Sequence, residues 1–220
     1  MKIDFVSDIA CPWCAVGLNA LEIALKRIGD DIPVTLHMQP FELNPDMAAE
    51  GVDASEYLAN KYGLSATQLA ANRANVCARG EAVGFAFGER SRVWNTFDAH
   101  RLLHWAGLQD IAKQRALKHA LLRSYHGEGS NPSSEVLLEL ALEVGLDGPA
   151  AQRILESDVY TREVREAEQF WIRNGINSVP VVIINNQHLI SGGQPPEVFE
   201  QAIRRIATQA QSAPSSVSGR

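Results

Sequence analysis

The chain has 220 residues, of which 45% are hydrophobic and 21% charged, a composition typical of a globular protein. Its net charge of −6 argues against nucleic acid or an anionic membrane surface as a main partner. No apolar run approaches the length of a membrane span, and three cysteines do not make a structural disulfide framework. The first ten residues do not resemble a secretory signal, so we expect a cytoplasmic protein.

The first predicted elements are a strand over residues 2–7 and a helix over 12–28. The helix is indicated by apolar residues at spacings of three and four, which place them on one face: Leu18, Leu21, Leu25 and Ile28. Pro12 suits the first helical turn, and Gly29 suits its end. Cys11 and Cys14 therefore lie where a strand meets the start of a helix.

The remaining pattern divides the chain into three regions. Residues 34–38 alternate apolar and polar side chains and predict a second strand. From about residue 54 to 175 we expect helices only, over 55–62, 65–83, 96–107, 109–125, 132–144, 149–156 and 158–174, with residues 126–130 in a loop. Strand character returns as a hairpin around Asn185-Asn186, and a last helix begins at Pro195-Pro196.

Both ends of the chain are expected to form one sheet, because neither piece alone buries both of its faces. The predicted fold class is therefore α/β, in the order βαβ, helical block, ββα. The domain boundaries that follow are residues 1–50 and 176–211 for the two parts of the sheet domain, 51–175 for an inserted helical domain, and 212–220 for a disordered tail.

The cysteine pair predicts thiol chemistry. Free N–H groups and the helix dipole stabilise a thiolate at Cys11, which is the expected nucleophile. Cys14 lies one turn deeper and can resolve a mixed disulfide on Cys11, so the two form a reversible two-electron couple. The same spacing also occurs in zinc sites, which need two further ligands, and no second pair of this kind exists. The strand and helix context favours the redox interpretation, with no metal.

Further stretches carry a resemblance to a known family. They are residues 41–47, residues 95–102, Val179-Pro180 and residues 191–196, together with Cys11-Pro12-Trp13-Cys14. With the helices between them, the chain resembles the DsbA-like thiol–disulfide oxidoreductases, and within these the FrnE-like subgroup. The resemblance implies a thioredoxin-like fold with a large helical insertion, and kinship with 2-hydroxychromene-2-carboxylate isomerases and kappa-class glutathione transferases.

The resemblance also implies roles for individual residues. Pro180 matches a cis-proline that faces the cysteines, and Val179 would pair with the substrate backbone; without the resemblance, Pro180 is equally an ordinary strand-start proline. Trp13 should be partly exposed beside Cys11. Positions matching residues that line the cleft in relatives are Asn44, Asn95 and His100. His100 could bond a substrate or tune the Cys11 thiolate, or it could simply bond to a nearby carbonyl group.

Three functions remain open at this point. The first is a thiol–disulfide oxidoreductase or isomerase acting on proteins, peptides or small thiols, with reduction or isomerisation favoured in a reducing cytosol. The second is a glutathione-dependent isomerase or transferase, in which Asn44 and Gln194 would contact glutathione; Cys14 argues against it, because such proteins usually keep a single Ser or Cys at the Cys11 position. The third is a redox-gated binding protein. We expect no bound cofactor, and glutathione would act as a co-substrate. The oligomeric state stays open, with a homodimer as one option, and so does the role of Cys77.

Overall fold

The structure is a computed structural model and describes residues 1–212, so nearly all of the predicted tail, 213–220, lies outside the described residues. The main sheet contains β1 (Lys2–Ser7), β2 (Thr35–Pro40), β5 (Val181–Ile184) and β6 (His188–Ser191). The helices are α1 (Pro12–Ile28), α2 (Ala54–Tyr62), α3 (Ala66–Glu81), α4 (Phe97–Gln109), α5 (Ile111–Leu122), α6 (Ser134–Glu143), α7 (Gly148–Leu155), α8 (Thr161–Arg173) and α9 (Pro196–Ser212). None of these helices is both long and apolar enough to cross a membrane.

The two ends of the chain form one sheet, as predicted. Its strand order is β2-β1-β5-β6, with β1 parallel to β2 and antiparallel to β5, and with β5 antiparallel to β6. Asn185 and Asn186 adopt positive φ angles of 51° and 57°, which suit the tight turn between β5 and β6. The predicted βαβ unit and the terminal hairpin are therefore confirmed.

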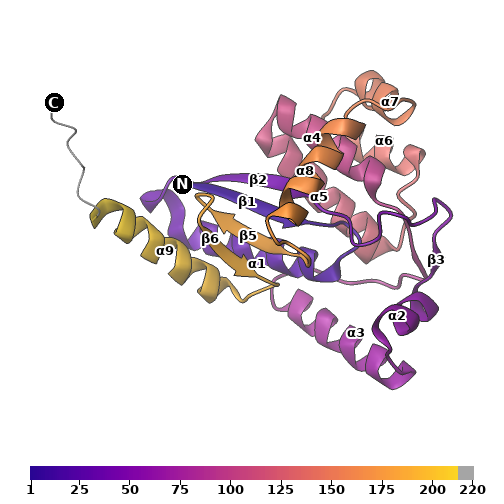
Figure 1. The fold of residues 1–220 in the computed structure, drawn as a ribbon, viewed down its shortest axis with the longest axis horizontal. Coiled ribbons are helices and arrows are strands. Elements are labelled where there is room, and N and C mark those ends of the chain that lie inside the picture. The colour runs from indigo at the N-terminus through magenta and orange to yellow at the C-terminus, as the bar shows by residue number, and fades with distance from the viewer. Residues whose placement is uncertain (213–220) are drawn as a thin grey trace.

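Helices cover both faces of this sheet (Figure 1). On one face α1 and α9 pack together, and buried residues from the strands and both helices form a common core: Ile3, Phe5, Leu18, Leu21, Val182, Phe199 and Ile203. On the other face a smaller core joins α8 to the sheet through Val6, Phe41, Trp171, Ile176 and Val181. Because β1 lies between these two layers, the position of its C-terminal end is well defined, and the cysteine motif follows shortly after that end.

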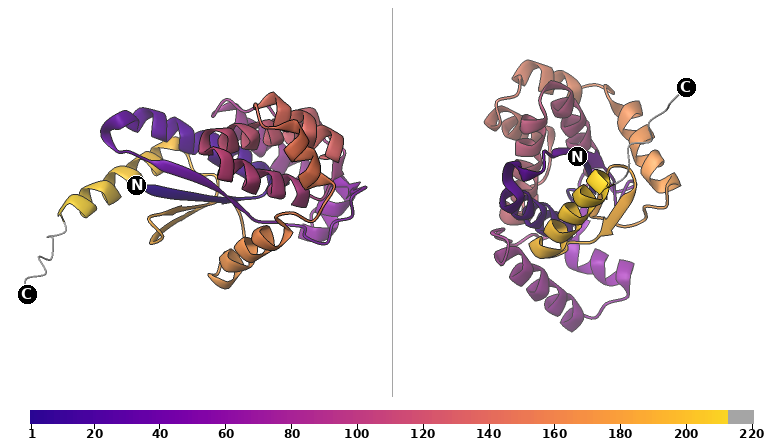
Figure 2. Two further views of the ribbon diagram at one scale, coloured as in Figure 1. Left: turned by 90° about the horizontal axis from the view of Figure 1, so that it is seen from above. Right: turned by 90° about the vertical axis from the view of Figure 1, so that its left-hand side faces the viewer.

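The remaining helices form two separate groups (Figure 2). Helices α4 to α7 pack around their own core, which includes Leu102, Leu117, Leu121, Tyr125 and Leu137, and α4 and α5 also contact β2. Helices α2 and α3 form a hairpin outside this bundle, and α3 contacts α1. The α2–α3 hairpin therefore lies close to the helix that begins with the cysteine motif.

Two predictions for the helical region are wrong. The sequence predicts helices only from about residue 54 to 175, but β4 (Arg92–Val93) lies within this region and pairs antiparallel with β3 (Val52–Asp53) at the base of the α2–α3 hairpin. Strands of two residues are too short to produce a periodic pattern. The predicted loop over 126–130 is also largely wrong, because α5 continues into a π-helical turn over Arg123–Glu128 in which Tyr125 and His126 are buried.

Candidate active site

Cys11 is the N-cap residue of α1, directly after the segment that follows β1. Its backbone is extended, with φ −87° and ψ 114°, and helical geometry begins at Pro12. The Val179–Pro180 peptide bond is cis, as the resemblance implies. The Cys11 thiol donates a hydrogen bond to the Val179 carbonyl oxygen, with 3.4 Å between Sγ and O. The fold thus brings together two segments that are far apart in the sequence.

Access to Cys11 is narrow. Only 4% of its surface is exposed, whereas a nucleophile for external disulfides needs a path to its sulfur. Its neighbours Pro12 and Trp13 are half-buried and line a groove beside the motif, so the partial exposure predicted for Trp13 is confirmed. The groove therefore lies beside the first turn of α1, next to Cys11 in the sequence.

Cys14 is fully buried one turn further along α1, and both motif cysteines are present as free thiols. Burial raises the pKa of Cys14 well above its ordinary value, and the hydrogen bond and charge interaction with Cys11 raise it further. The positive charge of Lys118 acts in the opposite direction. Cys14 is therefore a protonated thiol at rest and depends on its surroundings to become a nucleophile.

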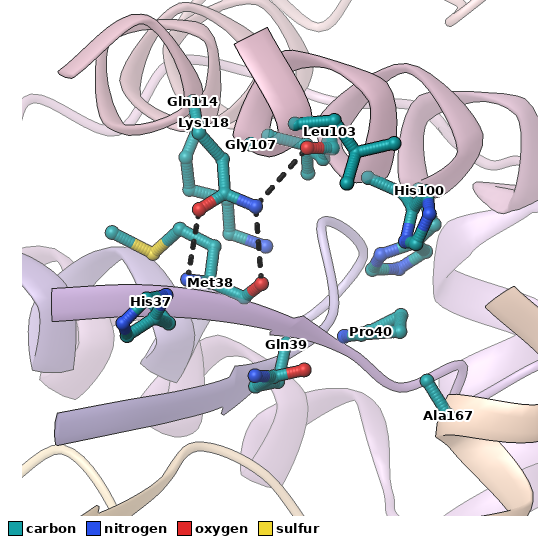
Figure 3. A pocket seen from close by; sticks show the side chains of 12 residues that line it. His37, Met38, Gln39, Pro40, His100, Leu103, Gly107, Gln114, Lys118 and Ala167 are labelled. Carbon is teal, nitrogen blue, oxygen red and sulfur yellow. Dashed lines mark hydrogen bonds between the residues drawn. The ribbon is translucent and has the colours of Figure 1, made fainter. Parts of the chain in front are cut away.

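Lys118 extends from α5 behind the motif and is 1% exposed. Burial lowers its pKa to about 8, although attraction to Cys14, Asp8 and Cys11 favours its charged form. It lines a second cavity of about 270 Å³ between α4, α5 and β2 (Figure 3). In the same view Gln114 joins α5 to the Met38 backbone of β2. Lys118 is thus a buried cation whose charge acts on the Cys14 thiol.

Asp8 organises the loop between β1 and the motif. Its carboxylate accepts hydrogen bonds from the Ala10 and Leu43 backbone N–H groups and from the Thr96 hydroxyl. His100 Nε2 lies 3.4 Å from the same carboxylate. Burial alone would raise the pKa of Asp8, but His100 and the backbone donors hold it below its ordinary value. The carboxylate is therefore a fixed negative charge under the motif.

The other residues implied by the resemblance are engaged within the protein. His100 is 1% exposed and bonds to Asp8, so its observed partner is a carboxylate. Asn44 accepts hydrogen bonds from Tyr57 and Lys61. Asn95 donates to the Met47 carbonyl, and Gln194 to the Ser191 carbonyl. None of Asn44, Asn95 and Gln194 lines either of the two cavities described here.

A groove of about 450 Å³ separates the first turn of α1 from the α2–α3 hairpin. Its lining combines residues of the motif, both helices of the hairpin and the segment that follows: Pro12, Trp13, Leu58, Tyr62, Leu69, Arg73, Val76, Cys77, Phe87, Arg90 and His126. Cys77, whose role the sequence left open, is thus a half-buried thiol in the wall of this groove.

His126 borders the motif as well and was not predicted as a site residue. Its Nε2 lies 2.8 Å from the Ile9 carbonyl oxygen. Burial lowers its pKa to about 3, and the charge of Arg90 lowers it further, so the ring is neutral at ordinary pH and donates this bond. In the sequence His126 begins a glycine-containing stretch that predicts a loop, so nothing in the pattern indicates that it is buried near the motif.

Gly17 sets the spacing between α1 and the cis-proline. A Cβ atom at this position would lie 3.0 Å from Pro180 Cγ and 3.4 Å from Gly193 Cα. We expect Gly17→Val to lower the free energy of unfolding by about 1–3 kcal/mol, as overpacking does, and to displace Pro180 from Cys11. Urea unfolding measures the effect, with Lys26→Val on the exposed face of the same helix as control. A loss no larger than that of the control would contradict the close packing.

Within residues 1–212 no three side chains of His, Cys, Asp or Glu form a group able to hold a metal ion. The fold itself is similar to several solved structures. The probable DsbA oxidoreductase of Streptomyces coelicolor is 34% identical, with 95% of this chain and 91% of that chain covered and a TM-score of 0.88. A 2-hydroxychromene-2-carboxylate isomerase shares 18% identity, with 96% and 98% covered and a TM-score of 0.72.

A third structure, the cytosolic disulfide reductase DsbM from Pseudomonas aeruginosa with GSH, is 16% identical, with 94% of this chain and 100% of that chain covered and a TM-score of 0.67. At identities below 20% these last two similarities concern the fold alone. A family model for the DSBA-like thioredoxin domain matches residues 2–204, nearly all of the described chain. The protein therefore belongs to the family of DSBA-like thioredoxin domains.

Proposed function

We propose that the protein is a thiol–disulfide oxidoreductase in which Cys11 exchanges disulfides with a substrate and Cys14 resolves the intermediate. One observation supports this above all: the Cys11 thiol caps α1 and lies 3.4 Å from the carbonyl oxygen that precedes the cis Val179–Pro180 bond. A sulfur at a helix N-terminus is activated as a nucleophile, and the adjacent extended backbone gives a substrate a place to pair. Family membership agrees with this chemistry.

In the reducing direction the exchange has two steps. The Cys11 thiolate attacks one sulfur of a substrate disulfide R–S–S–R′, forms a mixed disulfide in which Cys11 Sγ is bonded to S–R, and releases R′S⁻. Cys14 then loses its proton and attacks the Cys11 sulfur, which forms the Cys11–Cys14 disulfide and releases RS⁻. The substrate gains two electrons and the cysteine pair loses two. An external thiol must return these electrons before the next cycle.

Glutathione is the small thiol that we propose for this return step, in the cytoplasm. The proposal is supported by the shared fold with DsbM, a cytosolic disulfide reductase whose structure was determined with GSH. A glutathione-dependent isomerase activity is the weaker alternative. Asn44 and Gln194, which would contact glutathione in that case, already bond to Tyr57, Lys61 and Ser191. A reducing cytosol also favours reduction or isomerisation over net oxidation.

The test compares the wild type with Cys11→Ser and Cys14→Ser in the dithiothreitol-driven reduction of insulin. We expect Cys11→Ser to lose essentially all activity above the uncatalysed rate. Cys14→Ser should instead accumulate a mixed disulfide on Cys11, which intact-mass measurement detects as an adduct. Wild-type activity in Cys11→Ser would refute the proposed function. A Cys14→Ser trap that captures one dominant protein from a lysate would favour the redox-gated binding role over general exchange.

A further inference from the structure

The groove beside the motif has the size of a small-molecule site. Its volume of about 450 Å³ falls within the range of roughly 300–1,000 Å³ that ligand pockets usually occupy. One side is formed by Pro12 and Trp13 of the motif, and the other by the α2–α3 hairpin. A molecule in this groove would therefore lie directly beside the turn that carries Cys11.

The hairpin side of the groove is largely apolar. Although α3 runs from Ala66 to Glu81, Gly80 is its single fully buried residue. Its apolar side chains Leu69 and Val76 are half-buried and line the groove, as do Leu58 and Phe87 from the flanking segments. Half-buried apolar side chains that line a groove are suited to an apolar ligand.

The charges in the groove are all of one sign. Its lining contains Arg73 and Arg90 but no Asp or Glu, in a chain with 26 acidic and 20 basic residues. Arg73 donates to the Gly88 carbonyl oxygen at 2.8 Å, and the Arg90 guanidinium lies 5.0 Å from the centre of the Tyr125 ring. Both cations are thus held by protein contacts, and no carboxylate of the groove lining neutralises them.

The two guanidinium groups also influence each other. Burial lowers the pKa of Arg90, and repulsion from Arg73 lowers it further. His126, the remaining titratable ring in the lining, is neutral because burial lowers its pKa to about 3. An anion placed near these groups would relieve the repulsion and form charge-assisted hydrogen bonds.

We infer that this groove binds the non-reacting part of the substrate, and that this part is a small apolar group, aromatic or aliphatic, that carries a carboxylate. Arg73 and Arg90 bind the carboxylate, the face of α3 holds the apolar body, and the substrate disulfide faces Cys11. The inference rests on the proposed function for the reacting end. Glutathione carries carboxylates as well, but it also has an ammonium group and lacks an apolar body, so it matches only the arginine end of this lining.

The reaction test uses two aromatic disulfides that differ in charge: bis(3-carboxy-4-nitrophenyl) disulfide and its neutral bis-amide. Their rates with the reduced protein are each divided by the rate with 2-mercaptoethanol, which removes differences in intrinsic reactivity. We expect a normalised preference of about tenfold for the carboxylate, the size of one charge-assisted hydrogen bond. The preference should fall with added salt, since ions screen exposed charges.

Arg73 is the position to vary, because Arg90 packs on Tyr125 and its removal endangers the fold. Arg73→Gln should reduce the preference to about twofold or less, and Arg73→Lys should keep most of it, since Lys retains the charge. Arg153→Gln, which removes an equal charge from the exposed surface of α7, is the matched control and should change nothing. No preference in the wild type, or an unchanged preference in Arg73→Gln, would overturn the inference.

A binding measurement separates this inference from the redox function. In a Cys11→Ser/Cys14→Ser variant, Cys77 is the remaining cysteine and reports on occupancy of the groove through its alkylation by iodoacetamide. We expect 4-phenylbenzoate to protect Cys77 at concentrations about tenfold lower than 4-phenylbenzamide, for the same electrostatic reason. Equal protection by both, or by neither, would overturn the inference. Absence of disulfide exchange in the wild type, together with intact protection in this variant, would instead refute the proposed function alone.

Discussion

Replacing His126 by glutamine should remove a large part of the acid sensitivity of folding. Burial lowers the pKa of His126 to about 3, whereas an unfolded histidine titrates near 6.5. Between these values the unfolded chain binds a proton that the folded chain excludes, so stability falls as the pH falls through this window. From pH 7 to pH 4 the histidine should cost about 3 kcal/mol, at 1.36 kcal/mol for each pKa unit.

The effect has to be measured as a difference between the variant and the wild type. Burial raises the pKa of Glu42 to about 8, with repulsion from Glu168 adding to the shift. A raised carboxyl pKa gives stability at low pH that is lost as the pH rises, which opposes the histidine over part of the same range. Because Glu42 is present in both proteins, its contribution cancels in the difference.

Urea unfolding at pH 7 and pH 4 gives the numbers. At pH 7 glutamine can still donate to the Ile9 carbonyl, and we expect a loss of about 1 kcal/mol for imperfect packing. At pH 4 the difference should move by about 3 kcal/mol in favour of His126→Gln. His37→Gln, at a half-buried strand histidine, is the control. A pH-independent difference would show that His126 accepts a proton in the folded state without cost.

The second large effect is expected at Lys118. Its positive charge lowers the pKa of the buried Cys14 thiol, so Lys118→Met should leave Cys14 more firmly protonated. The second step of the exchange, in which Cys14 attacks the mixed disulfide, should slow by about tenfold at pH 7, equivalent to about 1.4 kcal/mol. The first step, which uses Cys11, should change much less.

The same substitution is expected to stabilise the fold. Burial lowers the pKa of Lys118 from 10.5 to about 8, so the charged form is disfavoured in the folded protein. At pH 7 Lys118→Met should raise the free energy of unfolding by about 2 kcal/mol, and the gain should shrink above pH 8 as the folded lysine loses its proton. An activity loss combined with a stability gain cannot be explained by damage to the fold.

Stopped-flow reaction with bis(3-carboxy-4-nitrophenyl) disulfide resolves both steps, because each releases one coloured thiolate. Lys113→Met is the matched control: it removes the same charge from α5, where Lys113 is half-buried and donates to the Gly145 carbonyl oxygen. Equal slowing of both phases in Lys118→Met, or an unchanged second phase, would contradict an electrostatic action of Lys118 on Cys14.

Much of the sheet could be predicted because its signals are local. Cys11 and Cys14 at a strand-to-helix junction, the alternation in residues 34–38 and the Asn185-Asn186 turn each depend on neighbouring residues alone. The partners of the site could not be predicted in this way. Whether Val179 lies beside Cys11 depends on the sheet order, and the cis bond was implied by the family resemblance rather than by any pattern.

The sequence does contain a signal for the role of Lys118. Leu117, Leu121 and Tyr125 are apolar positions of the helix predicted over 109–125, and Lys118 falls three residues before Leu121 on the same face. A lysine within a buried stripe indicates either a charged partner or an altered pKa, and here the structure has both. For His126 no such signal existed, because its burial arises from the π-helical turn that ends α5.

The base of the α2–α3 hairpin has a consequence for how this protein can vary. The chain enters through β3 and returns through β4, and Arg92 and the Ala54 N–H bind these two segments to each other. The segment between these two strands could thus be exchanged as a unit, because Cys11, Cys14 and Pro180 lie in other parts of the chain. Homologues could then keep the same cysteine chemistry and differ in their substrates through changes in this one segment.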